Sequence, residues 1–174
     1  MHFPLKARSF AWYEGPIVKA LLQLKYKPNR RLADLMADWL VEIHPGEQWP
    51  EALIVPVPLG QIRSRQRGYN QADLIASSLA HKLAMPYDTS VLWRERETNS
   101  QVGLSPTDRR RNVFGAFRAE TRRLTGRPVL VVDDLFTTGS TLSSCAEALL
   151  SAGAASVFAL TVARAESTDA DRIR

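Results

Sequence analysis

A short polar segment behind an apolar stretch combines acids, hydroxyls and a glycine in a pattern that could bind a sugar phosphate. Its residues are Asp133, Asp134, Thr137, Thr138, Gly139, Ser140 and Thr141. A carboxylate only accepts hydrogen bonds, so the two acids suit neighbouring sugar hydroxyls, whereas the threonine and serine hydroxyls suit phosphate oxygens. The glycine lets the backbone approach a ligand closely, and a helix beginning here would add unpaired N–H groups and a positive dipole end. The segment therefore has the chemistry to hold both ends of a ribose 5-phosphate.

A plainer interpretation of the same segment is that its acids end a strand and that Ser140 caps a helix. The apolar stretch 128–133 is typical of a buried parallel strand, and a helix is expected over 140–151. The chain carries neither the P-loop motif nor the glycine pattern of Rossmann domains. Two acids, two threonines and a glycine in this order are uncommon after a strand, which favours the ligand-binding interpretation.

The remaining elements predict the scaffold that would position this segment. Helices are expected over 16–27, 31–43 and 70–84, strands over 52–57, 91–93 and 156–162, an edge strand over 113–118, and loops over 58–69 and 94–112. The first helix is expected to pack through one face, formed by Val18, Leu21, Leu22 and Tyr26. Apolar strands that alternate with helices are typical of an α/β fold with a mostly parallel sheet flanked by helices. Ligands of such sheets bind beyond the carboxyl ends of the strands.

One domain is expected over 1–174, with N-terminal helices at about 16–43, a core at about 52–163 and a polar tail over 165–174. The single cysteine, Cys145, excludes an intrachain disulfide and a cysteine-rich zinc site, and its apolar helical neighbours favour a core position. No apolar stretch has the length of a membrane span, and no signal peptide is recognisable. We therefore expect a cytoplasmic location.

The net charge of +5 is concentrated in arginine clusters that suit polyanions such as pyrophosphate, single-stranded DNA or RNA. The clusters are Arg63, Arg65 and Arg67; Arg109, Arg110 and Arg111; and Arg122, Arg123 and Arg127. A solvated basic surface is the plain alternative for each cluster. Because 18 acidic residues dilute the field, charge alone does not identify a partner.

The string VLVVDDLFTTGST, residues 129–141, resembles the signature with which type I phosphoribosyltransferases bind phosphoribosyl pyrophosphate (PRPP). The resemblance implies a type I phosphoribosyltransferase-like fold in which Asp133 and Asp134 face the ribose hydroxyls and Thr137 to Thr141 hold the 5-phosphate. It also implies a magnesium ion carried mainly by the pyrophosphate of the ligand, with no residue assigned directly to the metal.

Three longer strings resemble the competence protein F (ComF) family, and this resemblance extends over about residues 15–163. They are LKYKPNRRLADLMADWL, PVPLGQIRSRQRGYNQADLIA and RERETNSQVGLSPTDRRRNVFGAF. The resemblance implies a role in natural transformation, in which imported single-stranded DNA is handled in the cytoplasm. It implies a DNA-translocating helicase and a recombination mediator as partners, in addition to PRPP or a related ribose phosphate.

The loop expected over 58–69 corresponds to the loop that binds pyrophosphate in type I phosphoribosyltransferases. The candidate contacts are Pro58, Leu59, Gly60, Arg63, Arg65 and Arg67, and in a later loop Arg109, Arg110 and Arg111. If the first loop is extended, its alternating arginines project to one side and suit bidentate phosphate contacts. Either set of arginines could instead contact DNA phosphates, and the sequence leaves this choice open.

The residues that open the helix over 70–84 also have two interpretations. Asn70 suits a helix cap. Tyr69 could stack on a base or cover the core, and the sequence does not decide between these roles.

The chain departs from the families it resembles in two respects. It lacks the four-cysteine zinc module with which many ComF-like proteins begin, and Thr137 stands where purine-salvage transferases carry an aspartate. Threonine cannot act as a general base near neutral pH, which weakens a purine-salvage assignment but leaves transferases of the orotate type open. The alternatives to a PRPP-binding module are an active transferase, whose acceptor base and catalytic residues are not recognisable in the sequence, and a nucleotide-responsive RNA-binding regulator.

Overall fold

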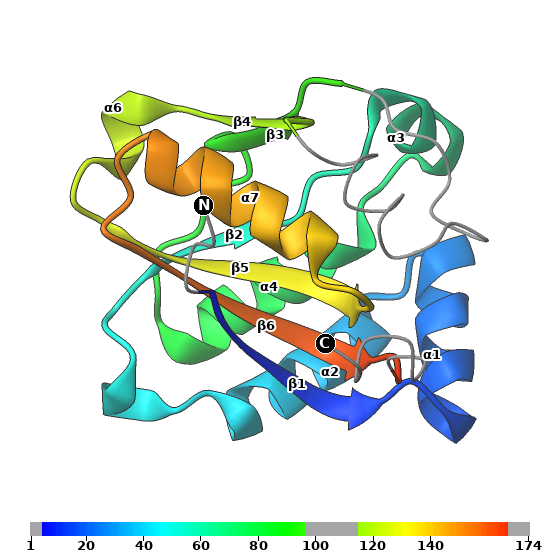
Figure 1. Ribbon diagram of the computed structural model, residues 1–174. Coiled ribbons are helices and arrows are strands. Elements are labelled where there is room, and N and C mark those ends of the chain that lie inside the picture. The colour runs from blue at the N-terminus through cyan, green and yellow to red at the C-terminus, as the bar shows by residue number, and fades with distance from the viewer. Residues whose placement is uncertain (1–4, 97–114, 167–174) are drawn as a thin grey trace, which may run out of the picture.

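A parallel sheet forms the centre of the molecule. The computed structural model describes residues 5–96 and 115–166. In this part of the chain the four-stranded sheet has the order β1 (Lys6–Trp12), β6 (Ser156–Arg164), β5 (Pro128–Phe136) and β2 (Leu53–Pro56), and all neighbouring strands are parallel (Figure 1). The predicted α/β fold is therefore confirmed.

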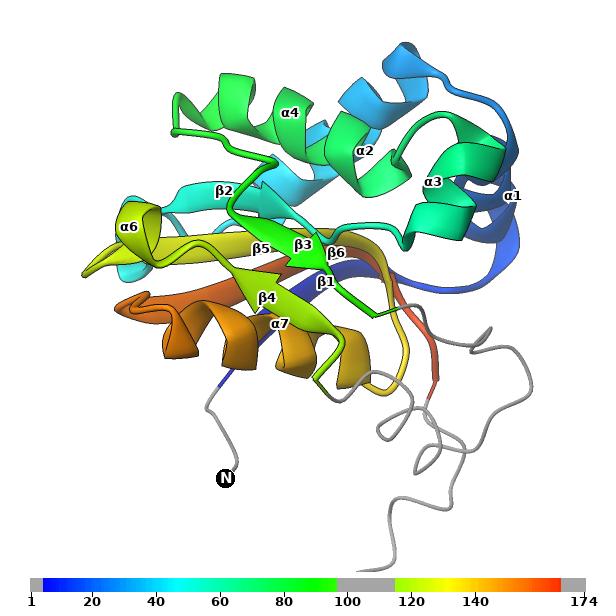
Figure 2. The ribbon, with the colours of Figure 1, turned by 90° about the horizontal axis from the view of Figure 1, so that it is seen from above.

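Helices cover both faces of this sheet, as Figure 2 shows. α2 (Arg30–Ile43) and α4 (Gln71–Leu83) lie on one face, and α7 (Ser140–Ser151) lies on the other. α1 (Gly15–Tyr26) and α3 (Gln61–Arg67) lie at the end of the molecule toward which the strands run. No helix within 5–96 and 115–166 combines the length and the apolar character needed to cross a bilayer.

A small antiparallel ribbon packs against α7. It consists of β3 (Leu92–Arg94) and β4 (Phe117–Ala119), and the short helix α6 (Thr121–Leu124) follows it. β4 overlaps the edge strand expected over 113–118 and ends one residue later. A single 3₁₀ turn, Gly46–Gln48, links α2 to β2.

Alternate side chains of β5 pack into two separate cores, one on each face of the sheet. Leu130 and Val132 pack with residues of α2 and α4, whereas Val129 and Val131 pack with residues of α7 and the ribbon. All four are at most 1% exposed. A strand that is buried on both faces has a continuous apolar sequence, which is why this strand could be predicted.

The first strand could not be predicted in the same way. No element was expected before residue 16, yet β1 pairs with β6 at the edge of the sheet. Its sequence KARSFAW includes two basic residues, and none of its residues is fully buried. An edge strand of this kind lacks the apolar run that identifies buried strands.

β5 also continues past the predicted 128–133 to Phe136, so the two acids lie within the strand.

Candidate functional site

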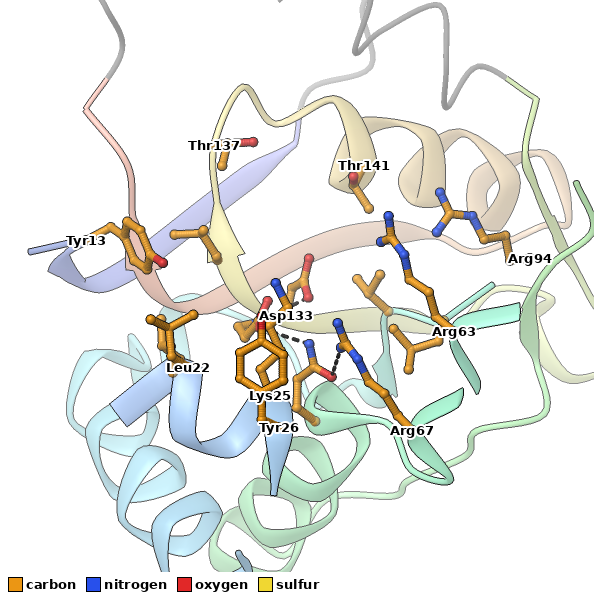
Figure 3. Close-up of a pocket in the computed structure, with 16 residues that line it drawn as sticks. Tyr13, Leu22, Lys25, Tyr26, Arg63, Arg67, Arg94, Asp133, Thr137 and Thr141 are labelled. Atoms are coloured by element: carbon orange, nitrogen blue, oxygen red, sulfur yellow. Dashed lines mark hydrogen bonds between the residues drawn. The ribbon is translucent and has the colours of Figure 1, made fainter. Parts of the chain in front are cut away.

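A cavity of about 490 Å³ opens at the carboxyl ends of β2 and β5. Residues from α1, α3, the start of α4 and the end of β3 line it together with the acids of β5. Figure 3 shows Asp133 between arginine side chains on one side and aromatic and aliphatic side chains on the other, with Thr137 and Thr141 across from α1. The cavity therefore has two chemically different ends on either side of an acidic centre.

The two acids are neighbours on β5, and both line the cavity. The backbone N–H of Asp134 donates to Oδ1 of Asp133 over 2.9 Å. Burial raises the pKa of Asp133 well above its usual value, the charge of Asp134 raises it further, and Arg94 opposes both effects. A cation or a hydroxyl group bound at Asp133 would offset the cost of burying its charge.

The raised pKa of Asp133 predicts that Asp133→Asn stabilises the protein in neutral solution. The unfolded chain loses this proton near the usual pKa of 3.8, whereas the folded protein keeps it to higher pH. Because the folded state binds more protons in this window, its free energy of unfolding falls as the pH rises above 3.8. Urea unfolding should show that the advantage of the variant is small at about pH 4 and larger at about pH 8.

Asp88 provides a control, because its replacement by asparagine should change the free energy of unfolding in the opposite direction. Although burial opposes the effect, hydrogen bonds from Ser90 and Arg123 lower the pKa of Asp88. Asp88→Asn should therefore destabilise the protein once the pH exceeds the usual value of 3.8. Equal stability of wild type and Asp133→Asn at every pH would contradict the assignment of Asp133 as a desolvated carboxyl.

The turn between β5 and α7 carries the hydroxyl residues. Gly139 adopts a φ of +75°, a left-handed conformation that other residues rarely adopt, and α7 begins at Ser140. Because Gly139 occupies the capping position and has no side chain, the idea that Ser140 caps the helix is wrong. Thr137 and Thr141 line the cavity, whereas Thr138 bonds Ser140 through hydroxyl oxygens 2.7 Å apart. The start of a twelve-residue helix beside these threonines has the dipole and N–H groups of an anion site.

The loop expected over 58–69 contains the helix α3, so the condition under which its alternating arginines would project to one side, an extended loop, is not met. α3 follows Gly60 and ends at Arg67, and Gly68 caps it with a left-handed φ of +73°. Residues four positions apart share one face of a helix. Arg63 and Arg67 therefore both line the cavity, whereas Arg65 is exposed and is not among the residues that line it.

The other candidates for anion contacts are distributed as follows. Leu59 lines the cavity, Pro58 is partly exposed, and Gly60 is buried at the start of α3. Arg109, Arg110 and Arg111 lie outside the described residues. Their contacts with pyrophosphate or DNA stay a prediction.

Arg94 joins Arg63 and Arg67 at what we call the arginine end of the cavity. It is the last residue of β3, and its guanidinium carbon lies 5.3 Å from the ring centroid of Phe117. This cation–π contact holds the side chain against the ribbon. Sequence reasoning did not identify Arg94, because no local pattern tells which polar residue at the end of a short strand faces a ligand.

The first turn of α4 reaches the acids through a residue that was given no role from the sequence. The predicted cap is confirmed, because Oδ1 of Asn70 accepts from the backbone N–H of Ala72. Nε2 of the next residue, Gln71, donates to Oδ2 of Asp134 over 3.0 Å, and its Oε1 accepts from Arg67 over 2.9 Å. Gln71 thus connects an acid of β5 to the arginine end.

Tyr69 makes a structural contact and is not among the residues that line the cavity. Its hydroxyl donates to the backbone carbonyl of Leu24 in α1 over 2.7 Å. Burial raises the pKa of this hydroxyl, although Arg67 opposes the shift. This hydrogen bond holds α1 against the start of α4, a role that neither interpretation of the sequence included, and stacking of Tyr69 on a base stays a prediction.

The side chains opposite the arginines form what we call the aromatic end of the cavity. They are Tyr13, Leu21, Leu22 and Tyr26, with Lys25 beside them. The expected packed face of the first helix is wrong for two of these residues, since Leu22 is 38% and Tyr26 is 76% exposed. Aromatic and aliphatic side chains around a cavity suit a flat ring such as a nucleobase.

The donors in the cavity fit magnesium only as an ion shared with a ligand. Among the described residues no three His, Cys, Asp or Glu side chains gather into a metal site. Magnesium usually keeps several waters and binds through one or two carboxylates plus substrate phosphates. Asp133 and Asp134 could supply those carboxylates to an ion carried by a pyrophosphate group.

Cys145 is buried in α7, where burial raises its pKa, and it packs in the core as expected.

Comparisons with known proteins agree with this geometry. A family profile described as "Phosphoribosyl transferase domain" matches residues 25–173. The chain is 38% identical over 151 residues to "DNA utilization protein YhgH" of Escherichia coli K12, which covers 83% of this chain and 66% of that protein. It is 41% identical over 118 residues to "Competence protein F" of Haemophilus influenzae, which covers 67% of this chain and 51% of that protein. The solved structure described as "the allosteric regulatory enzyme of purine biosynthesis" matches with a TM-score of 0.51 at 18% identity, over 81% of this chain and 30% of that chain.

The fold and the site define a phosphoribosyltransferase-like protein with a parallel sheet and an acidic ligand cavity. The chain belongs to the phosphoribosyl transferase domain family and, within it, to the ComF proteins. It spans about two thirds of the length of the Escherichia coli relative.

Proposed function

We propose that this chain binds PRPP or a related ribose phosphate together with magnesium. One observation carries the proposal: a single cavity brings the acids of β5, the threonines at the start of α7 and the arginine end together. Asp133 and Asp134 would accept hydrogen bonds from the ribose hydroxyls, and the turn of Thr137 to Thr141 would hold the 5-phosphate. The arginine end would then hold the pyrophosphate, and the acids would supply carboxylate oxygens to the magnesium ion that the pyrophosphate carries.

Calorimetric titration tests this proposal directly. PRPP, ribose 5-phosphate and inorganic pyrophosphate are titrated into the wild-type protein with and without magnesium. The proposal predicts that PRPP binds more tightly than either fragment and that magnesium strengthens its binding, because only PRPP engages all three parts of the cavity. Absence of PRPP binding to the folded protein, in the presence of magnesium, would contradict the proposal.

The names of the relatives support a biological setting for this binding. They include "DNA utilization protein YhgH" and "Competence protein F". We propose that this chain acts in the cytoplasm in the handling of DNA during natural transformation, with single-stranded DNA, a helicase and a recombination mediator as partners. Co-purification of these partners with the chain from transforming cells tests this setting, and recovery equal to that from cells without the chain would contradict it.

Substitutions of Arg63 and Arg65 should distinguish the residues that bind PRPP from those that bind DNA. Arg63 lines the cavity and Arg65 does not, so Arg63→Met should weaken PRPP binding about tenfold, whereas Arg65→Met should change it less than about twofold. If α3 contacts DNA phosphates, each substitution should reduce the slope of log affinity against log salt by about one. Calorimetry and fluorescence anisotropy with a single-stranded oligonucleotide measure the two effects, and equal losses of PRPP affinity in both variants would contradict the helical arrangement.

The aromatic end favours a second candidate function, the transfer of phosphoribose to a base. A flat ring stacked among Tyr13, Leu22 and Tyr26 would lie across the acids from the arginine end. Catalysis would then depend on positioning and on stabilising the departing pyrophosphate, not on a general base. Release of pyrophosphate from PRPP in the presence of nucleobases or orotate tests this function, and no release with any of them would favour a binding module.

A further inference from the structure

Gln71 is a buried polar residue in the wall of the cavity. The residue is 7% exposed, although glutamine is usually found at the surface. Burial of an amide is costly unless its donors and acceptor are paired. We therefore expect the amide of Gln71 to be paired. Its partners are two of the groups that would bind the ligand, Arg67 and Asp134.

The position of Gln71 is fixed by the residue before it. Asn70 caps α4 through the N–H of Ala72, and its Nδ2 donates to the backbone carbonyl of Val57 over 2.9 Å. This second bond ties the first turn of α4 to the segment that follows β2. Gln71 is therefore held at the carboxyl edge of the sheet, beside the acids.

The two ends of the Gln71 amide meet groups of opposite character. Oε1 accepts from Nη1 of Arg67 over 2.9 Å, and Nε2 donates to Oδ2 of Asp134 over 3.0 Å. The reversed amide would place two donors against each other at Arg67 and two acceptors against each other at Asp134. The neighbours thus determine the orientation of the amide.

A neutral amide can accept a hydrogen bond from a guanidinium through its oxygen and donate one to a carboxylate through its nitrogen. A carboxylate at position 71 would satisfy only the arginine, and a cation would satisfy only the acid. None of the ion pairs found among the described residues joins Arg67 to Asp134. The amide of Gln71 therefore stands between the two groups and contacts both, and Oδ1 of Asp134 is not used by the glutamine.

We propose that Gln71 is a positioning residue that holds Arg67 and Asp134 apart and oriented toward the ligand. The amide couples the arginine end of the cavity to the acids that would hold the ribose, because the guanidinium polarises the amide and strengthens its donation to the carboxylate. This role rests on the proposed binding of PRPP, and it adds a residue that acts through two others.

The first test replaces Gln71 with a side chain of similar shape that cannot form either bond. Gln71→Met should lower the affinity for magnesium and PRPP about tenfold, the loss expected from one charge-assisted hydrogen bond, while circular dichroism stays unchanged. Gln66→Met makes the same substitution on the exposed surface of α3 and should change the affinity less than about twofold. Wild-type affinity in folded Gln71→Met would overturn the proposal.

The second test has a pH signature that a merely structural role would lack. In Gln71→Glu the introduced carboxylate pairs with Arg67 and repels Asp134, so the affinity for PRPP falls at about pH 8. When the introduced carboxyl is protonated it regains one donor and one acceptor, as in glutamine. The affinity of the variant relative to wild type should therefore rise as the pH falls to about 5. A ratio that is independent of pH would overturn the proposal.

The third test needs no ligand and separates this inference from the proposed function. The side-chain amide signals of Gln71 are recorded by NMR in the wild type, in Arg67→Met and in the matched variant Arg65→Met. Loss of the bond to Arg67 should shift these signals, whereas Arg65→Met should leave them in place. Equal spectra in all three proteins would overturn the coupling, whereas failure of the wild type to bind PRPP would refute the proposed function alone.

Discussion

Asp133→Asn combined with Asp134→Asn is expected to lower the affinity for magnesium and PRPP by at least about 100-fold, because each lost charge weakens a hydrogen bond by about 1.5 kcal/mol or more. An amide is neutral and presents one acceptor oxygen, so it holds neither the magnesium ion nor the ribose hydroxyls as a carboxylate does. Calorimetric titration of the double variant measures the loss. The fold should be retained, since asparagine matches aspartate in shape and the cores on both faces of β5 are unchanged.

A matched control removes the same charge far from the cavity. Glu42 and Glu47 are exposed and are not among the residues that line the cavity, so Glu42→Gln with Glu47→Gln should leave PRPP affinity within about twofold of wild type. Equal affinity in wild type and the double asparagine variant would contradict the assignment of the acids to the ribose.

Gly139→Ala is expected to damage both stability and ligand binding. Its φ of +75° disfavours any side chain, and an added Cβ would lie 2.9 Å from the ring of Phe136. A left-handed conformation costs an alanine about 1–2 kcal/mol, and the contact with Phe136 adds to this. We expect the free energy of unfolding to fall by about 1–3 kcal/mol and PRPP affinity to fall at least about tenfold. Urea unfolding and calorimetry measure the two effects.

Gly126→Ala is a control that introduces the backbone strain expected in Gly139→Ala without its close contact with Phe136. The φ of +70° at Gly126 is similar, but a Cβ there would meet nothing within 4 Å. Gly126→Ala should therefore lose about 1–2 kcal/mol of stability and keep its PRPP affinity. If Gly139→Ala binds PRPP as well as Gly126→Ala does, the turn before α7 does not hold the 5-phosphate.

The parts of the fold that could be predicted are those in which one periodic pattern dominates. Val129 to Val132 are buried on both faces, and α2 buries one regular stripe, so both produce clear signals. β1 was missed because an edge strand with two basic residues has no such signal. α3 was missed because six of its seven residues are polar or basic and its one apolar residue, Ile62, forms no stripe. Only the glycines on either side indicate its bounds.

The candidate site was predictable to the extent that it lies within one continuous segment. The order of Asp133 to Thr141 carries its chemistry in the local sequence, so this part of the site could be proposed before the fold was known. Arg94 comes from β3, Gln71 from α4, and the aromatic end from α1 and the segment before it. Their importance depends on long-range packing, which no local spacing encodes.

The most direct test of the central claim is a crystal structure of the protein with PRPP and magnesium. The account predicts that the ribose hydroxyls lie within hydrogen-bond distance of Asp133 and Asp134. It also predicts the 5-phosphate at the turn of Thr137 to Thr141 and the pyrophosphate at the arginine end. A fully occupied ligand outside this cavity, or one with its ribose away from both acids, would contradict the account.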